Sequence, residues 1–219
     1  MPQGELDFLQ RTYGWMSLGL ALTGAIAWLV ANTPSLQQAV FGNPVLLYGA
    51  FIAEFVLVVA FATRAERMSL AAAAATFTAY AALNGVTMAT IFVLYTATSI
   101  SRVFFVCAGA FAALALYGAT TKRDLTSAGR FMFIGLVGIL LASVANLFLK
   151  SAGVYWISTY AGVLVFAGLT AYDNQKLREL YARQGETGNL ALQGALILYL
   201  DFINLFLMLL RIFGRRRDS

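Results

Sequence analysis

The sequence predicts an all-α, polytopic membrane protein with seven transmembrane helices. Of its 219 residues, 60% are hydrophobic and only 11% are charged, and the mean hydropathy is +0.76. A soluble globular domain has about 25% charged residues, so this composition excludes that class. The longest polar stretches, residues 1–13, 120–130 and 174–189, are each too short to bury a core of their own. We therefore expect a single transmembrane domain over residues 1–219.

Seven apolar runs are long enough to cross a bilayer as helices. They cover residues 14–31, 45–62, 70–95, 102–119, 130–149, 154–173 and 190–211. The first run lacks a small-residue cleavage site followed by a soluble domain, so we expect a retained helix rather than a signal peptide. Small residues, as in 71–75 and 109–113, predict that the helices approach one another closely.

The basic residues predict the orientation of the chain. Loops rich in Lys and Arg stay in the cytoplasm, and nine basic residues lie on one side of the spans against two on the other. The nine are Arg11, Arg64, Arg67, Lys122, Arg123, Arg130, Lys176, Arg178 and Arg183, and the two are Arg102 and Lys150. We therefore expect a multi-pass protein of the inner (plasma) membrane with a cytoplasmic N-terminus.

Four further arginines near the C-terminus conflict with this orientation. Seven full crossings place Arg211, Arg215, Arg216 and Arg217 outside, whereas a re-entrant last helix keeps them inside. Both interpretations stay open, and we favour seven crossings because early helices usually fix the topology.

The chain has no histidine and a single cysteine, Cys107. One cysteine excludes a disulfide within the chain, and its small apolar neighbours predict a packing role. Without histidine, any response to pH near neutrality must come from carboxyl groups. We expect no enzymatic activity, no bound cofactor and no nucleic-acid partner.

Asp173 and Asp201 lie in the last two apolar runs, and they are the strongest candidates for function. A carboxylate in hydrocarbon costs about 2.5 to 3.5 kcal/mol on insertion scales, so such residues usually mark a water-filled path, a proton site or an ion site. Antiparallel helices joined by a tight turn place residues level when they are equally far from the turn. The midpoint of the pair is residue 187, within the expected turn at 185–188, Gly-Glu-Thr-Gly. The spacing therefore permits a facing pair if the sixth helix continues to residue 183.

Two facing carboxyl groups in a poorly solvated site tend to share one proton, which predicts a pH switch recessed into the cytoplasmic half of the membrane. Their oxygens are also hard ligands, so Asp173 and Asp201 are our candidate metal ligands. Taken alone, Asp173 also fits a solvated residue at the membrane interface. Asp201 lies between Leu200 and Phe202, which makes a passive role harder to explain.

Two further charged residues are candidates. Glu54 lies in the middle of the second span, where a glutamate is either protonated or faces water, and we assign it to an ion pathway. Arg64 ends the same span, where it is either a topology anchor or a counter-charge for Asp173 that stabilises a closed state. Three neutral polar residues within spans fit helix-to-helix hydrogen bonds and pore lining equally well: Asn84, Thr87 and Asn146.

The segments 171–176 (AYDNQK) and 198–206 (LYLDFINLF), followed by Leu209-Leu210-Arg211, resemble the C-terminal signature of the transmembrane Bax inhibitor motif family, and its bacterial members in particular. The resemblance implies a seven-helix fold with the last helix central in the bundle. It also implies a pH-sensitive calcium leak controlled by the aspartates that match Asp173 and Asp201, with calcium as the transported or bound ion. A gating arginine of the family maps onto Arg64, with Arg67 as a competitor.

Two other classes of function remain open. Intramembrane aspartyl proteases resemble the chain at Tyr172-Asp173, but their Gly-x-Gly-Asp around the second aspartate is missing, since Leu198-Tyr199-Leu200 precedes Asp201. Bacterial relatives are similar to modulators of a membrane-anchored ATP-dependent protease, and eukaryotic ones to suppressors of cell death. The arm of residues 1–13 is then the expected contact, while membrane lipids, calcium and protons are the partners of a leak.

Overall fold

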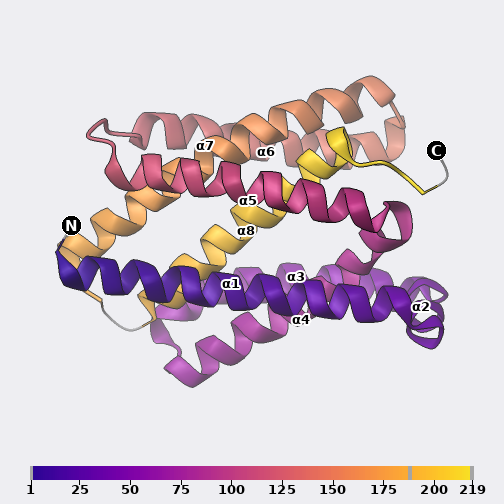
Figure 1. Cartoon of the computed structure of the whole chain (residues 1–219), viewed down its shortest axis with the longest axis horizontal. Coiled ribbons are helices and arrows are strands. Elements are labelled where there is room, and N and C mark those ends of the chain that lie inside the picture. The colour runs from indigo at the N-terminus through magenta and orange to yellow at the C-terminus, as the bar shows by residue number, and fades with distance from the viewer. Residues whose placement is uncertain (1, 187–188, 218–219) are drawn as a thin grey trace. The chain divides into compact units, whose positions relative to one another are not determined.

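The structure, a computed structural model that describes residues 2–186 and 189–217, confirms the all-α fold. Its elements are α1 (Gln3–Asn32), α2 (Pro34–Phe41), α3 (Pro44–Arg64), the short 3-10 helix η1 (Ala65–Arg67), α4 (Leu70–Leu94), α5 (Ala97–Thr120), α6 (Thr126–Leu149), α7 (Ala152–Gln184) and α8 (Leu190–Phe213) (Figure 1). Seven of them, all but α2 and η1, are long and apolar enough to cross a membrane. The seven expected spans are therefore present.

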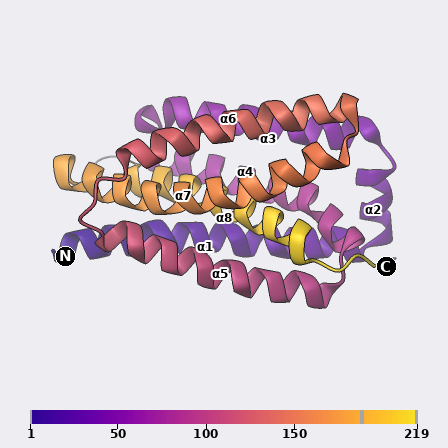
Figure 2. The ribbon, with the colours of Figure 1, turned by 90° about the horizontal axis from the view of Figure 1, so that it is seen from above.

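Four helix ends differ from the hydropathy boundaries by four residues or more. α5 begins at Ala97 rather than at residue 102, and α6 begins at Thr126 rather than at residue 130. α1 begins at Gln3 rather than at residue 14, and α7 continues to Gln184 rather than ending at residue 173. Hydropathy reports where a helix leaves hydrocarbon, and a helix can continue into water beyond that point. The eight-residue α2, which connects the C-terminal end of α1 to the N-terminal end of α3, was not predicted (Figure 2).

Local sequence explains where several helices begin and end. Thr33 is extended ahead of Pro34, which occupies the first turn of α2, a position where the missing N–H of proline costs nothing. Asn43 caps α3 by accepting hydrogen bonds from the backbone N–H groups of Val45 and Leu46. The turn expected at 185–188 begins as predicted, because Gly185 has a positive φ of 69°, while Thr187 and Gly188 lie outside the described residues.

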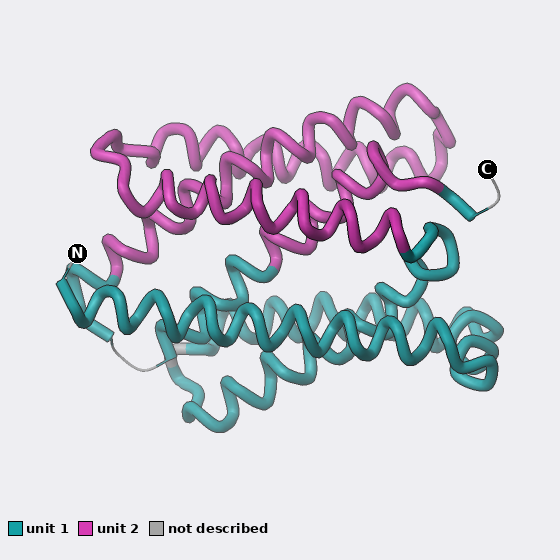
Figure 3. The backbone as a smooth tube through the Cα atoms, viewed as in Figure 1, with its two compact units in different colours: residues 1–97, 181–199, 216–219 teal, residues 98–180, 200–215 magenta. Residues whose placement is uncertain are grey.

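The chain forms two compact units (Figure 3). Unit 1 contains residues 1–97, 181–199 and 216–219, and unit 2 contains residues 98–180 and 200–215. In unit 1, α4 packs against both α1 and α3. In unit 2, the ring of Phe202 on α8 packs edge-on against Phe104 and Phe111 of α5. Helices α7 and α8 contribute residues to both units.

The helices differ strongly in burial. In the most hydrophobic window of α8, 61% of residues are buried, against 6% for α3 and for α6. α8 is thus the most buried candidate span, as the family resemblance implied. Few residues of α3 and α6 are buried by the rest of the structure.

Contacts within unit 1 bear on whether the last helix crosses the membrane. The side chain of Asn189 donates hydrogen bonds to the carbonyls of Ala65 and Met68, at the start of α4. At the other end of α4, the N–H of Arg217 donates to the carbonyl of Leu94. α4 has 25 residues and is about 37 Å long. Between Asn189 and Arg217 the chain therefore travels the length of α4, which favours a full crossing over a re-entrant helix.

Candidate functional site

Asp173 of α7 and Asp201 of α8 lie together in unit 2, and their carboxyl groups are hydrogen bonded to each other. Asp173 lies eleven residues before the end of α7, and Asp201 lies eleven residues after the start of α8. The facing arrangement expected from the midpoint is thus present because α7 continues past Asp173. A hydrogen bond between two carboxyl groups requires a proton on one of them. The pair is therefore built to hold one shared proton.

Asp201 is almost fully buried. Its side chain is 5% exposed, and its Oδ2 atom is buried with no hydrogen bond from an N–H or hydroxyl group of the described residues. Leaving a buried polar atom unsatisfied costs about 1 to 3 kcal/mol, so such atoms usually have a functional reason. The bond to Asp173 is the partner that the pair itself supplies.

The two aspartates alone do not make a resident metal centre. Within residues 2–186 and 189–217, no group of three or more His, Cys, Asp or Glu side chains is placed to hold a metal ion. Calcium takes six to eight oxygen ligands, of which two carboxylates supply only a part. The pair fits weak, transient contact with a hydrated cation better than tight binding.

The part of α7 that carries Asp173 is anchored to the connection between α5 and α6. The side chain of Gln175 accepts a hydrogen bond from the N–H of Leu125 and donates one to the carbonyl of Arg123, each at 2.8 Å. In the same connection, side-chain and backbone hydrogen bonds from Thr126 lower the pKa of the exposed Asp124 carboxyl below its usual value. These bonds fix the position of α7 two residues beyond Asp173.

A second polar cluster, here called the Glu54 cluster, lies in unit 1 and joins four helices. The hydroxyl of Thr87 donates to Glu54 Oε1 at 2.6 Å, and the amide of Asn84 donates to Glu54 Oε2 at 3.4 Å. Tyr199 of α8 donates to Asn84 Oδ1 at 3.0 Å, and its hydroxyl lies 2.7 Å from that of Thr23 on α1. The structure thus connects the ion-pathway candidate to both α4 residues whose role the sequence left open. The contributions of Thr23 and Tyr199 were not predicted.

Comparisons of the sequence with known proteins show the family to which the chain belongs. The family model described as "Inhibitor of apoptosis-promoting Bax1" matches residues 5–218. The chain belongs to the Bax inhibitor-1 family. Among its relatives in this family, "Inner membrane protein YbhL" of Escherichia coli is 48% identical over 98% of the chain and 94% of the relative. An uncharacterized protein of Rickettsia prowazekii is 39% identical over 99% of the chain and 92% of the relative. An uncharacterized membrane protein of Streptococcus pyogenes is 39% identical over 97% of the chain and 94% of the relative.

The arginine expected to gate this Bax inhibitor-1 family protein is Arg64, which ends α3 in unit 1 and is exposed. Across the described residues the ion pair found joins Arg11 to Glu186 at 2.7 Å, and Arg64 forms none. Its competitor Arg67 is exposed as well. Because the aspartate pair belongs to unit 2, a counter-charge role for Arg64 stays a prediction.

Cys107, by contrast, has the packing role that the sequence predicted for it. Its side chain is fully buried in α5, and its Sγ lies 3.9 Å from the carbonyl of Phe202.

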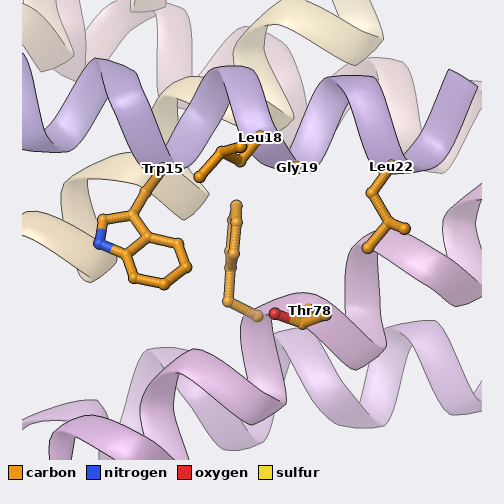
Figure 4. A pocket seen from close by; sticks show the side chains of 6 residues that line it. Trp15, Leu18, Gly19, Leu22 and Thr78 are labelled. Atoms are coloured by element: carbon orange, nitrogen blue, oxygen red, sulfur yellow. The ribbon is translucent and has the colours of Figure 1, made fainter.

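A groove of about 260 Å³ lies between α1 and α4. It is lined by Trp15, Leu18, Gly19, Leu22, Phe77 and Thr78 (Figure 4). The groove contains no charged side chain, so we assign it no part in ion movement.

Proposed function

We propose that this Bax inhibitor-1 family protein is a pH-sensitive calcium leak of the membrane, gated by the proton that Asp173 and Asp201 share. One observation carries the proposal: two hydrogen-bonded carboxyl groups lie on adjacent membrane-spanning helices, and that of Asp201 is almost fully buried. Groups of this kind within membrane spans are costly and mark proton or ion pathways.

The gate works through the charge of the pair. With the shared proton present, the pair carries one negative charge, and removal of the proton gives two. A pair with two charges attracts a counter-charge more strongly, and we assign that role to Arg64, whose attraction keeps the cytoplasmic end closed. A fall in pH restores the proton, weakens the attraction and opens the path.

Calcium is the proposed ion because the pathway offers only hard oxygen ligands. Carboxylates at Glu54, Asp173 and Asp201 each replace a part of the hydration shell, and none holds the ion tightly enough to stop it. Conduction requires such weak, successive sites.

The deciding experiment is calcium flux into liposomes that contain only the purified protein. We expect flux above that of empty liposomes, and we expect it to increase as the pH falls between about 8 and 6, because the pair then regains its shared proton. Flux equal to that of empty liposomes throughout this range would contradict the leak and support a non-conducting modulator.

Replacement of Glu54 by glutamine should lower calcium flux without moving the pH midpoint. The substitution removes a charge from the pathway and leaves the proton-sharing pair intact. Flux is measured over the same pH series, with Glu179→Gln, an exposed site near the end of α7, as the matched control. A shift of the midpoint as large as in the aspartate variants would assign Glu54 to the gate instead.

The structure changes how the modulator alternative has to be tested. Residues 3–13 are the first turns of α1, and Phe8 is fully buried and stacked on Tyr181. Deletion of this segment removes core packing along with any protein contact. Substitution of the exposed Asp7 and Gln10 probes a partner surface without that loss.

A further inference from the structure

The Glu54 cluster has a feature that a simple contact between helices does not need: its hydrogen bonds run in one direction. Asn84 donates its amide hydrogen to Glu54, so its Oδ1 atom faces Tyr199 and must accept. The single hydroxyl hydrogen of Tyr199 is used in that bond. The hydroxyl of Thr23 lies 2.7 Å from that of Tyr199 and 2.8 Å from the carbonyl of Ala81, to which it donates, so Thr23 is not counted as a donor to Tyr199. Donation passes from Tyr199 through Asn84 to the carboxylate.

A second donor reaches Glu54 from the same helix. Thr87 Oγ1 lies 2.6 Å from Glu54 Oε1 and 3.0 Å from the carbonyl of Asn84, and the shorter bond to a charged acceptor is the stronger. An ionised Glu54 accepts both donors. A protonated Glu54 would accept these bonds less strongly and would need an acceptor for its own hydrogen.

The cluster is also shielded from water on the side of its donors. Tyr199 is fully buried, and Thr23, Asn84 and Thr87 are 3%, 6% and 5% exposed. Glu54 itself is half-buried. A charge in this setting is stable only when fixed donors replace its hydration. The donors are therefore arranged to stabilise an anion.

We propose that Tyr199, Asn84 and Thr87 form a donor chain that holds Glu54 as a fixed negative charge, and that this charge selects cations over anions. The inference rests on the proposed leak and adds its selectivity element. Rings of acidic side chains select cations in channels by the same electrostatics. Tyr199 and Asn84 act through Glu54 and are positioning residues.

Two measurements test the proposal. The first is the infrared difference spectrum between the protein and its Glu54→Gln variant at pH 7. This spectrum shows the ionisation state of Glu54 and does not depend on ion conduction. The second is the ratio of cation to chloride permeability in planar bilayers. We expect Glu54 to be ionised, Tyr199→Phe to lower the ratio about fivefold and Thr87→Val to lower it about tenfold, since a hydrogen bond to a charged group is the stronger.

Matched controls separate this role from simple packing. Tyr80→Phe alters a buried ring 5.8 Å from that of Tyr199, and Thr76→Val alters an exposed hydroxyl on the same helix as Thr87. Both should leave the spectrum and the ratio unchanged, and Thr87→Ser should restore them. A neutral Glu54 in the unaltered protein, or an unchanged ratio in Tyr199→Phe, would overturn the proposal. If the protein passes no ion, the proposed leak and the selectivity role fail together, while the spectrum still decides whether the donor chain holds a charge.

Discussion

Replacement of either aspartate of the pair by asparagine is expected to abolish the near-neutral pH dependence of calcium flux. In Asp173→Asn, Asp201 titrates alone, without the repulsion of a second carboxylate, and Asp201→Asn does the same for Asp173. The hydrogen bond between the two side chains is what couples them in the structure. Flux is measured in liposomes over the same pH series, and each single variant should lose the transition completely.

The control for this experiment is Asp7→Asn, which removes the same charge from an exposed position of α1. Its pH profile should match that of the unaltered protein. Arg64→Ala should raise flux at high pH while the transition persists, because it removes the proposed counter-charge and leaves the proton site. If both aspartate variants kept the full transition, the carboxyl groups would not act as a coupled pair, and the gating mechanism would be wrong even for a protein that leaks calcium.

The second large effect is expected at Gly118, where α5 and α7 are in close backbone contact. A Cβ atom at this position would overlap the carbonyl oxygen of Ala171 and lie 2.8 Å from its carbonyl carbon. The obstacle is backbone, which cannot rotate away as a side chain can. Gly118→Ala should therefore lower stability by about 1 to 3 kcal/mol, the usual cost of overpacking, and displace the segment of α7 that carries Asp173.

Thermal unfolding in detergent measures this effect, and α5 supplies its own control. Gly109 has no atom within 4 Å of the position that its Cβ would occupy. Gly109→Ala should leave the unfolding temperature unchanged or slightly higher, since alanine has a higher helix propensity than glycine. Equal unfolding temperatures for both variants would show that the close contact between α5 and α7 is not maintained in solution.

The aspartate pair was predictable from sequence because its geometry is local. Two antiparallel helices and one turn fix the relative depth of Asp173 and Asp201, and only the length of α7 had to be correct. The Glu54 cluster was not predictable in the same way. Thr23 and Tyr199 are separated by 176 residues, and their contact depends on which helices are neighbours and how each is rotated. The sequence contains no signal for either.

Family membership and the structure differ in what they add to these predictions. The match over residues 5–218 establishes the family, and the contacts establish which polar groups meet. The proposals that calcium is the ion and that a proton gates its flux rest on the family resemblance and on the hard oxygen ligands. The flux experiments test both proposals. The helix boundaries at Gln3 and Gln184 were missed because hydropathy follows the membrane rather than the helix.

The low burial of α3 and α6 has a consequence for how the sequence can change over time. A surface that contacts only acyl chains is constrained to remain apolar, but one apolar side chain there serves as well as another. The side of α3 that carries Glu54 is the exception, since Asn84 and Thr87 of α4 meet it. Among relatives 39% to 48% identical, substitutions should therefore accumulate on α3 and α6 and spare α4 and α8.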